Sequence, residues 1–228
     1  MTALPRREQN RIAREQRILS AALTVFSETG YSGTTMDAIA AGAGLSKPTL
    51  YQYFDSKEAL FSAMMLGHRN RMMDVFEHPS PDGMVADLLG FARDYAETVM
   101  RPDMLSLARL IIGEVQRFPE IGAAYQAMGP DRLLRGIMDY LVSRRALGLL
   151  AFDDAELAAQ DLWGLILSAP RTQALYQPDH LPGAAQLARY MHNGLRVFLK
   201  AYSTRPAADL ADLDARLARP QQVKRHDA

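Results

Sequence analysis

Cysteine is absent from the 228 residues of this chain. Without a thiol, the protein can form neither a disulfide framework nor a thiolate metal site. The histidines also lack the close spacing of metal ligands, since they stand at His68, His78, His180, His192 and His226. We therefore expect no metal and no disulfide, and a reducing cytoplasm as the compartment.

Long hydrophobic runs and an excess of either charge are missing as well. No apolar stretch approaches the roughly 18 residues of a membrane-spanning helix, and none resembles a signal peptide. The 26 basic and 26 acidic residues balance to a formal net charge of zero. This balance argues against a protein that coats DNA or an anionic membrane through bulk charge. We expect a soluble protein with no membrane partner, in which any DNA affinity comes from a local patch.

Signatures of catalysis are lacking too. No serine-centred nucleophile motif is present, and no glycine-rich phosphate loop follows a strand. Gly42 and Gly44 instead punctuate helices. The sequence predicts neither an enzyme nor a bound cofactor.

The chain also lacks the alternation of apolar and polar residues that is typical of β-strands. Apolar spacing is helical almost throughout, which predicts an all-α protein. A first helix is expected near Arg11 to Thr29, with Gly30 as its stop. Its apolar stripe consists of Leu19, Ala22, Leu23 and Phe26.

Residues 34–54 have the pattern of two short helices joined by a tight glycine turn, the build of a DNA-reading helix-turn-helix. Thr34 or Thr35 can cap the first helix, and Gly44 can take the left-handed conformation that ends it. The apolar face of this helix is Met36, Ile39, Ala40 and Ala43. We expect the Leu45 side chain to anchor this turn in the hydrophobic core.

The second short helix has two start signals. Ser46 is a good N-cap, and Pro48 lies in the first turn, where a missing backbone N–H has no cost. The result is a short helix with an exposed N-terminal end.

Residues 17–60 resemble the DNA-binding domain of the TetR family of one-component transcriptional regulators. The matching positions are Ile18, Ala22, Phe26, Gly30-Tyr31, Thr34-Thr35, Ile39-Ala40, Ala43-Gly44, Ser46 to Tyr51, Tyr53-Phe54, Lys57-Glu58 and Leu60. The resemblance implies a three-helix DNA-binding domain over residues 1–60, and a larger helical domain for ligand binding and dimerisation over residues 61–203. Residues 204–228 are polar and predict a mobile tail, with a short helix near Asp209 to Ala218.

The expected DNA-binding residues are Thr35, Ser46, Lys47, Pro48, Thr49, Tyr51, Gln52, Tyr53 and Lys57. In the major groove, Lys47 can donate to guanine, Pro48 and Thr49 can pack on a thymine methyl, and Gln52 can pair with adenine. The sequence leaves open which of these contacts forms. The resemblance implies phosphate contacts for Thr35, Tyr51, Tyr53 and Lys57, although partial burial is an alternative role for either tyrosine.

The N-terminal arm supplies a local basic patch. Against only Glu8 and Glu15, it carries Arg6, Arg7, Arg11, Arg14 and Arg17. Such a patch suits DNA phosphates, and a solvated helix start is the alternative.

Further helices follow from the apolar pattern and its breaks. A capping pair of Asp55 and Glu58 is expected to open a helix that runs toward Glu77. The segment from His78 to Gly83 breaks the pattern. Later helices are expected from Met84, over 103–117, over 120–147 with a kink or division at Gly129-Pro130, over 153–176 and over 181–202.

The helix over 153–176 has more apolar surface than one core-facing stripe needs. The resemblance implies that the last two long helices pair with those of a second subunit as a four-helix bundle. Packing within the monomer is the alternative. A homodimer would read a palindromic operator with half-sites roughly 34–36 Å apart.

The resemblance also implies a cavity for an unidentified small-molecule effector among the central helices. The candidate lining residues are Phe91, Tyr95, Met104, Leu107, Ile111, Tyr125, Met128 and Trp163. Their flexible and flat side chains suit an apolar molecule, but each is also an ordinary core residue type. Residues 113–121 are similar to a segment of an AefR-like branch of the family, in which Glu114 and Arg117 are spaced for a local ion pair.

Together these features predict a homodimeric repressor that a small, largely apolar ligand releases from its operator, with coupling through the helix from Lys57 to Glu77. Two alternatives remain, a helical carrier that has lost DNA binding and a DNA-binding protein that needs no ligand. A carrier would have no reason to keep Thr35, Lys47, Tyr51 and Lys57.

Overall fold

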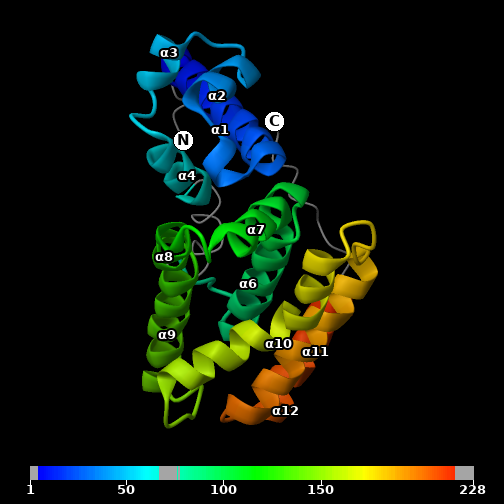
Figure 1. Ribbon diagram of the computed structural model, residues 1–228. Coiled ribbons are helices and arrows are strands. Elements are labelled where there is room, and N and C mark those ends of the chain that lie inside the picture. The colour runs from blue at the N-terminus through cyan, green and yellow to red at the C-terminus, as the bar shows by residue number, and fades with distance from the viewer. Residues whose placement is uncertain (1–4, 67–75, 77, 219–228) are drawn as a thin grey trace. The chain divides into compact units, whose positions relative to one another are not determined.

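The computed structural model describes residues 5–66, 76 and 78–218 of the chain. Over these residues the protein is helical and contains no β-strand beyond an isolated bridge between Leu150 and Ser203. The predicted all-α class is therefore confirmed. The helices are α1 (Arg6–Gly33), α2 (Met36–Gly42), α3 (Lys47–Tyr51), α4 (Lys57–Leu66), α6 (Met84–Val99), α7 (Pro102–Glu114), α8 (Pro119–Met128), α9 (Pro130–Ala146), α10 (Ala155–Tyr176), α11 (Ala184–Tyr202) and α12 (Pro206–Ala218) (Figure 1).

The chain divides into two compact units. Unit 1 comprises Met1–Asn70 and Thr98–Arg132, and unit 2 comprises Arg71–Glu97 and Leu133–Ala228. Unit 1 extends past the expected boundary at residue 60, because α7 packs on α1 and α8 packs on α4. The functional boundary at residue 60 stays a prediction.

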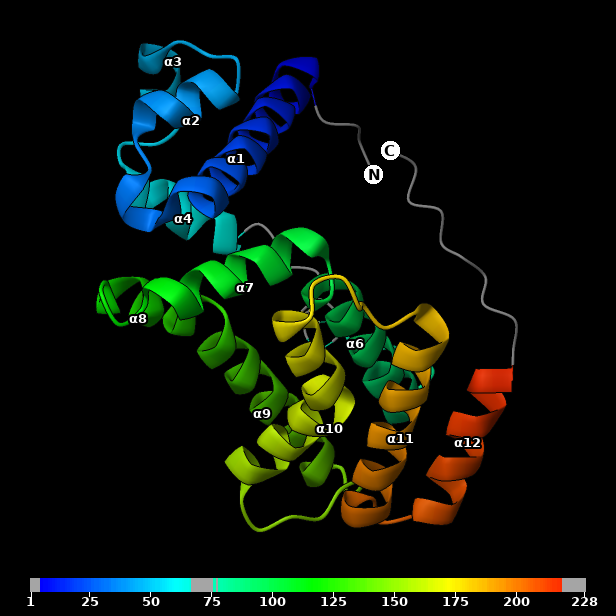
Figure 2. The same ribbon diagram turned by 45° about the vertical axis from the view of Figure 1, so that its right-hand side comes forward.

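The core of unit 1 forms around α1, which packs against α2, α4 and α7 (Figure 2). Ile18, Ala22 and Phe26 recur at helical spacing and are fully buried. Phe26 stacks on Tyr31 at 5.7 Å between ring centroids, and both rings meet Phe61 of α4 edge-on. Burial of large aromatic rings contributes most to cores of this size, so this cluster holds the short helices of unit 1 in place.

Gly30 interrupts α1 near its end. Its φ of 70° lies in the left-handed region that favours glycine. The regular helical backbone is therefore interrupted at Gly30, where the sequence predicts the end of the helix. The helix begins at Arg6 rather than near Arg11.

In unit 2, α10 and α11 lie side by side and α12 packs on α11. The close approach of α10 and α11 requires Gly194, because a Cβ there would overlap the backbone carbonyl of Leu165. Buried Asp87 ties three segments together, since its carboxylate accepts from the Tyr140 hydroxyl at 2.7 Å and from the Ser80 backbone N–H at 2.7 Å. Burial and the bond to Asp87 raise the pKa of Tyr140.

The structure decides between the alternatives at Gly129-Pro130 and corrects the expected cap of α4. The helix expected over 120–147 is divided into α8 and α9, because Pro130 has no backbone N–H to continue the ladder past Gly129. The start of α4 is capped by Ser56 and not by the expected pair of Asp55 and Glu58. The Ser56 hydroxyl accepts a hydrogen bond from the Ala59 backbone N–H at 3.1 Å. The expected course of this helix to Glu77 lies outside the described residues.

The segment expected as a polar tail contains the helix α12. Its sequence is polar because only one narrow stripe faces the protein, with Leu213 fully buried. Asp209 is buried as well, and it accepts from the Ser203 hydroxyl at 2.6 Å and pairs with Arg205 at 3.1 Å. These contacts fix the start of α12 at Pro206, three residues before the start of the short helix expected near Asp209 to Ala218.

None of the described helices combines a stretch of 18 residues with the hydropathy that a lipid bilayer requires.

Candidate nucleic-acid interface

The helix-turn-helix forms from the local signals that the sequence contains. The Thr35 hydroxyl caps α2 by accepting from the Ala38 N–H at 3.1 Å, which decides between the two threonines. Gly44 has a φ of 64° and turns the chain toward α3. Ser46 caps α3 by accepting from the Thr49 N–H at 3.4 Å, with Pro48 in the first turn.

One side of α3 is anchored and the other is open. Leu50 is fully buried, and Phe54, just past the helix, is buried too. Lys47, Pro48 and Gln52 are exposed, and Tyr51 is 42% exposed. The buried leucine fixes the rotation of α3 about its axis, so the expected DNA-contacting side chains face solvent together.

Lys47 already has an anionic partner. Its Nζ lies 2.8 Å from the Asp37 carboxylate of α2. The hydrogen bond to this carboxylate raises the pKa of Lys47. Both side chains are more than half exposed, so screening by water keeps the pair weak and exchangeable for a base or a phosphate.

The hydroxyl groups of Thr49 and Ser46 form a hydrogen bond with each other at 2.7 Å. This bond leaves the Thr49 methyl as the group available for packing, in keeping with an apolar contact to thymine. Tyr53 is half-buried and follows α3 directly.

Lys57 is engaged inside unit 1. Its Nζ donates to the backbone carbonyl of Tyr31 at 2.8 Å and lies 4.5 Å from the centroid of the Tyr31 ring. The Tyr31 hydroxyl in turn lies 3.2 Å from the Glu58 carboxylate. Burial, with the nearby Glu58 charge, raises the pKa of Tyr31 to about 12. No local pattern predicts this internal role, because Lys57 and Tyr31 are 26 residues apart along the chain.

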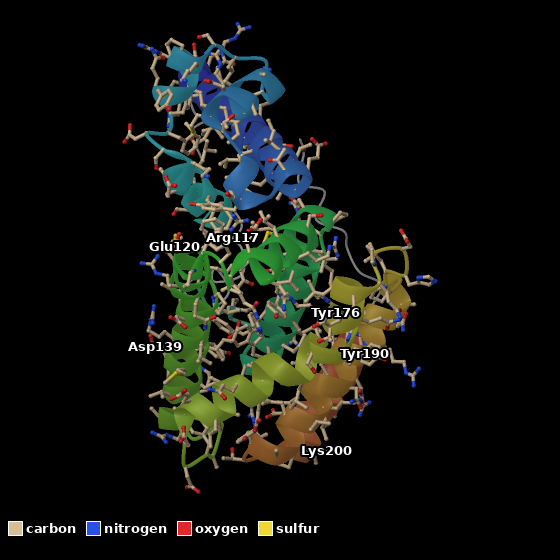
Figure 3. All side chains as sticks on the ribbon, viewed as in Figure 1. Arg117, Glu120, Asp139, Tyr176, Tyr190 and Lys200 are labelled. Atoms are coloured by element: carbon tan, nitrogen blue, oxygen red, sulfur yellow. The ribbon has the colours of Figure 1, made fainter. Side chains whose placement is uncertain are left out.

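Glu114 joins the same cluster from α7. Its carboxylate accepts from the Tyr31 backbone N–H at 3.1 Å and occupies the space that a Cβ at position 30 would need. The ion pair expected between Glu114 and Arg117 is wrong, because Glu114 satisfies a backbone donor that the kink at Gly30 releases. Arg117 lies 5.6 Å from the Phe118 ring instead, and Figure 3 labels it together with Glu120 of α8.

The arginines of the N-terminal arm divide into two groups. Arg11 pairs with Glu8 at 2.7 Å and with Glu15 at 3.4 Å. Arg17 donates to the Ala43 carbonyl at 3.0 Å and so closes the end of α2. The remaining three, which are Arg6, Arg7 and Arg14, are exposed. The basic patch that is open to a ligand is smaller than the sequence suggested.

The expected effector-contacting residues fall in both units. Phe91, Tyr95 and Trp163 of unit 2 adjoin one another, with ring centroids 5.8 Å apart for the first pair and 6.4 Å for the second. In unit 1, Leu107 and Ile111 are buried in the core, Tyr125 and Met128 pack against it, and Met104 is half-buried on α7. Core packing and ligand contact both stay open for each of them.

Within the described residues, no three histidine, aspartate or glutamate side chains lie close enough together to hold a metal ion.

Comparisons with known proteins agree with this geometry. Residues 18–64 match the model of bacterial regulatory proteins of the tetR family, and residues 86–204 match the model of the AefR-like transcriptional repressor C-terminal domain. Escherichia coli RutR, an HTH-type transcriptional regulator, is 39% identical over 84 residues, which are 37% of this chain and 34% of RutR. The Mycolicibacterium smegmatis activator FasR is 43% identical over 70 residues, which are 29% of this chain and 32% of FasR. The match thus spans about a third of the length of these curated relatives.

Solved structures are similar over most of the chain. A putative TetR-family regulator from Mesorhizobium loti has a TM-score of 0.70 and 30% identity, and the match covers 85% of this chain and 98% of that one. The flavonoid-responsive regulator FrrA has a TM-score of 0.63 and 31% identity with the same coverage. Bacillus subtilis FadR in complex with stearoyl-CoA has a TM-score of 0.61 at 20% identity, over 80% of this chain and 96% of that one, and shows the fold alone.

Proposed function

The chain belongs to the TetR family of transcriptional regulators, and from this premise we propose that it acts as a homodimeric repressor released from its operator by a small, largely apolar molecule. The proposal rests above all on α3. Its buried Leu50 anchors the helix, and its exposed Lys47, Pro48 and Tyr51 face solvent, where they can contact DNA. We refer to α3 with these side chains as the reading head. The name of the matched C-terminal model, a repressor, supports repression over activation.

The proposed contacts follow from this orientation. Lys47, Pro48, Thr49 and Gln52 face base edges, and the Ser46 cap sets the start of the helix. Thr35, Tyr51, Tyr53 and Lys57 contact phosphates and set the register of the protein on DNA. Lys57 donates one N–H to Tyr31, which leaves two donors for a phosphate.

A second copy of this chain is the proposed partner for α10 and α11. Apolar side chains remain exposed on both helices, at Leu157 (58%), Leu165 (37%), Tyr190 (40%) and Val197 (41%). Gly164 has open space around its Cα, which suits close approach of another helix. Figure 3 labels Tyr176 on α10, 76% exposed, and Tyr190 on α11. Apolar side chains in this number support an interface over a solvated face.

Dimerisation serves DNA recognition directly. The five residues of α3 reach only a few base pairs. Two copies related by a two-fold axis read two half-sites roughly one helical turn apart, about 34–36 Å, on a palindromic operator.

The proposed effector class comes from aromatic side chains of unit 2. In unit 2, Phe91, Tyr95 and Trp163 form an aromatic cluster with Phe76 and Tyr140. Flat apolar rings of this kind suit an apolar or aromatic molecule. FrrA, which is 31% identical to this chain, is named flavonoid-responsive. This name supports a small, largely apolar effector for this chain.

Helix α7 offers a short route from ligand to DNA reader. It carries Met104, Leu107 and Ile111, which are expected effector contacts, and it packs on α1. Through Glu114 it also holds the backbone of Tyr31. A ligand that shifts α7 therefore displaces the reading head, and a preference of 1–3 kcal/mol for the displaced state is a typical coupling free energy.

Selection of binding sites from a random duplex pool, with the purified protein at fixed salt, tests the proposal. We expect an inverted repeat with half-sites about one turn apart. The same operator then supports in vitro transcription, in which repression is expected with the protein and relief with an effector found by thermal-shift screening. Recovery of no sequence motif by a folded protein contradicts the proposed function.

A further inference from the structure

Helix α1 packs on both α4 and α7 within unit 1 (Figure 2), and a hollow lined by all three helices remains there. Its volume is about 460 Å³, which lies within the range of roughly 300–1,000 Å³ that is typical of small-molecule sites. The described residues that line it all belong to unit 1. They are Gln16, Leu19, Ser20 and Leu23 of α1, Met64 of α4, and, in or just before α7, Arg101, Asp103, Met104 and Leu107.

The apolar part of this lining is continuous with the core of unit 1. Met64 and Leu107 are buried in that core, and the half-buried Leu19 and Leu23 pack against it. Met104 is half-buried as well, and the flexible side chain of methionine adapts to partners of different shape. An apolar group bound in the hollow therefore extends the core and removes partly exposed apolar surface from water.

The polar part of the lining has hydrogen-bonding groups without a partner. Gln16 and Ser20 are exposed one helical turn apart on α1. Within the part of the chain that the structure describes, neither side chain makes a hydrogen bond. An amide and a hydroxyl each donate and accept, so this end of the hollow suits a ligand group that does both.

The two charged side chains of the lining neutralise each other. The guanidinium of Arg101 donates from Nε to the Asp103 carboxylate at 2.9 Å and from Nη2 at 2.6 Å. No other charged side chain is among the described residues of the lining. A charged ligand would lose water in the hollow without gaining an opposite charge, so the lining favours an uncharged molecule.

We propose that this hollow is a binding site for an uncharged amphipathic small molecule. The apolar body of the ligand contacts Leu23, Met64 and Met104. Its polar end, a hydroxyl or an amide, forms hydrogen bonds with Gln16 and Ser20. A molecule held by α1 and α7 together stabilises the contact between these helices, because it binds only where both are in place.

This inference goes beyond the proposed function, because it assigns a second ligand site to the unit that contains the helix-turn-helix. The aromatic cluster proposed to contact the effector belongs to unit 2 and includes Phe91, Tyr95 and Trp163. None of these three residues lines the hollow. A ligand in the hollow therefore contacts α1 of the DNA-binding unit directly.

Titration of the full-length protein with n-octanol, followed by NMR of its methionine methyl groups, tests the inference. Met64 and Met104 report on the hollow, whereas Met84 and Met191 are buried in unit 2 and report on that unit. We expect n-octanol to shift the signals of Met64 and Met104. At neutral pH, octanoate and octylammonium should bind about tenfold more weakly, because their charged ends lose water without a counter-charge.

Two variants probe the two ends of the site. Ser20→Phe should fill the hollow from α1 and abolish the shifts of Met64 and Met104. Ser27→Phe is the matched control, because Ser27 is exposed on the same helix and does not line the hollow. Gln16→Leu removes the amide and should weaken n-octanol binding by about two- to tenfold, as expected for the loss of one hydrogen bond between uncharged groups.

Trp163 gives an independent signal for unit 2, because it is the only tryptophan of the chain. The inference is overturned if n-octanol leaves Met64 and Met104 unchanged, whatever happens to the fluorescence of Trp163. It is also overturned if neither Ser20→Phe nor Gln16→Leu alters binding, or if the three octyl compounds bind equally. Circular dichroism confirms that the variants are folded. None of these measurements uses DNA, so the proposed function is decided separately by operator selection.

Discussion

Lys57 combines an internal contact with an expected external one. Its ammonium group donates to the Tyr31 carbonyl and lies over the Tyr31 ring. The Tyr51 side chain, by contrast, is exposed. Lys57→Ala should therefore lower both the unfolding temperature and the affinity for every DNA sequence. A hydrogen bond to a charged group contributes about 1.5–3 kcal/mol, and the half exposure of Lys57 places the loss at the lower end.

The matched variant is Tyr51→Phe, which should weaken DNA binding and leave thermal stability unchanged. Differential scanning calorimetry and fluorescence anisotropy with operator DNA separate the two effects. Equal unfolding temperatures for Lys57→Ala and wild type would show that the contact to Tyr31 contributes nothing to stability.

Gly30 is required for two separate reasons. Its backbone is in the left-handed region, and the Glu114 carboxylate fills the space where a Cβ would stand. Gly30→Ala should cost about 1–3 kcal/mol for the backbone conformation alone, because a φ of 70° with a ψ of 171° is a region essentially restricted to glycine, with a further cost for displacing Glu114. Chemical denaturation measures the sum.

Gly113→Ala is the control for this prediction. Gly113 has a regular helical backbone and open space around its Cα, so alanine there should be neutral or stabilising by up to about 1 kcal/mol. If both variants have the same stability, Gly30 is not under the constraint described above.

Sequence alone was enough at positions where the cause is local. Thr35, Gly44, Ser46 and Pro48 act on backbone groups within three residues, and propensity and capping rules describe such contacts well. The bond between Glu114 and the Tyr31 N–H spans 83 residues. Nothing in either local pattern indicates it, because it forms only when α7 packs on α1.

At the scale of the element, α3 depends on its cap more than a longer helix would. Five residues are too few to form a stable helix on their own. Ser46→Ala removes the hydroxyl that accepts from the Thr49 N–H, with an expected cost of about 0.5–2 kcal/mol. DNA affinity should fall with it, because the start of α3 carries Lys47 and Pro48.

Ser32→Ala is the comparison for Ser46→Ala, since Ser32 is exposed on α1 and its side chain makes no bond within the described residues. Thermal unfolding and operator binding should be unchanged in this variant. A cap variant that binds DNA as well as Ser32→Ala would argue that α3 is ordered by Leu50 alone.

Helix boundaries were predictable where glycine or proline marks them, and less so elsewhere. The break at Gly129-Pro130 was visible in the sequence, but whether it kinks or divides the helix depends on packing. The short helix expected near Asp209 to Ala218 is α12, which begins three residues earlier, at Pro206. The assignment of α7 and α8 to unit 1 likewise follows from tertiary contacts alone.

At the scale of the whole molecule, the apolar face of α10 and α11 is the proposed dimer interface. A charge placed at Val197 should separate two copies if that face is their interface, since burial of an unpaired carboxylate costs several kcal/mol. Val197→Glu should therefore shift the protein to monomer in sedimentation velocity and abolish operator binding, while each chain stays folded.

Leu147→Glu is the matched control, because Leu147 is 65% exposed just past α9 and belongs to neither α10 nor α11. This variant should remain dimeric and bind DNA as wild type does. Monomeric behaviour of the wild type itself, or of both variants alike, would remove α10 and α11 as the interface.

The shared space of Gly30 and Glu114 also has an evolutionary consequence. A side chain at position 30 and a long acid at position 114 exclude each other in this packing. Related sequences should therefore change at the two positions together, or keep both. Such paired variation would mark, across a gap of 83 residues, which relatives dock α7 on α1 through the same contact. It would sort the family by how the reading head is held, independently of what each member binds.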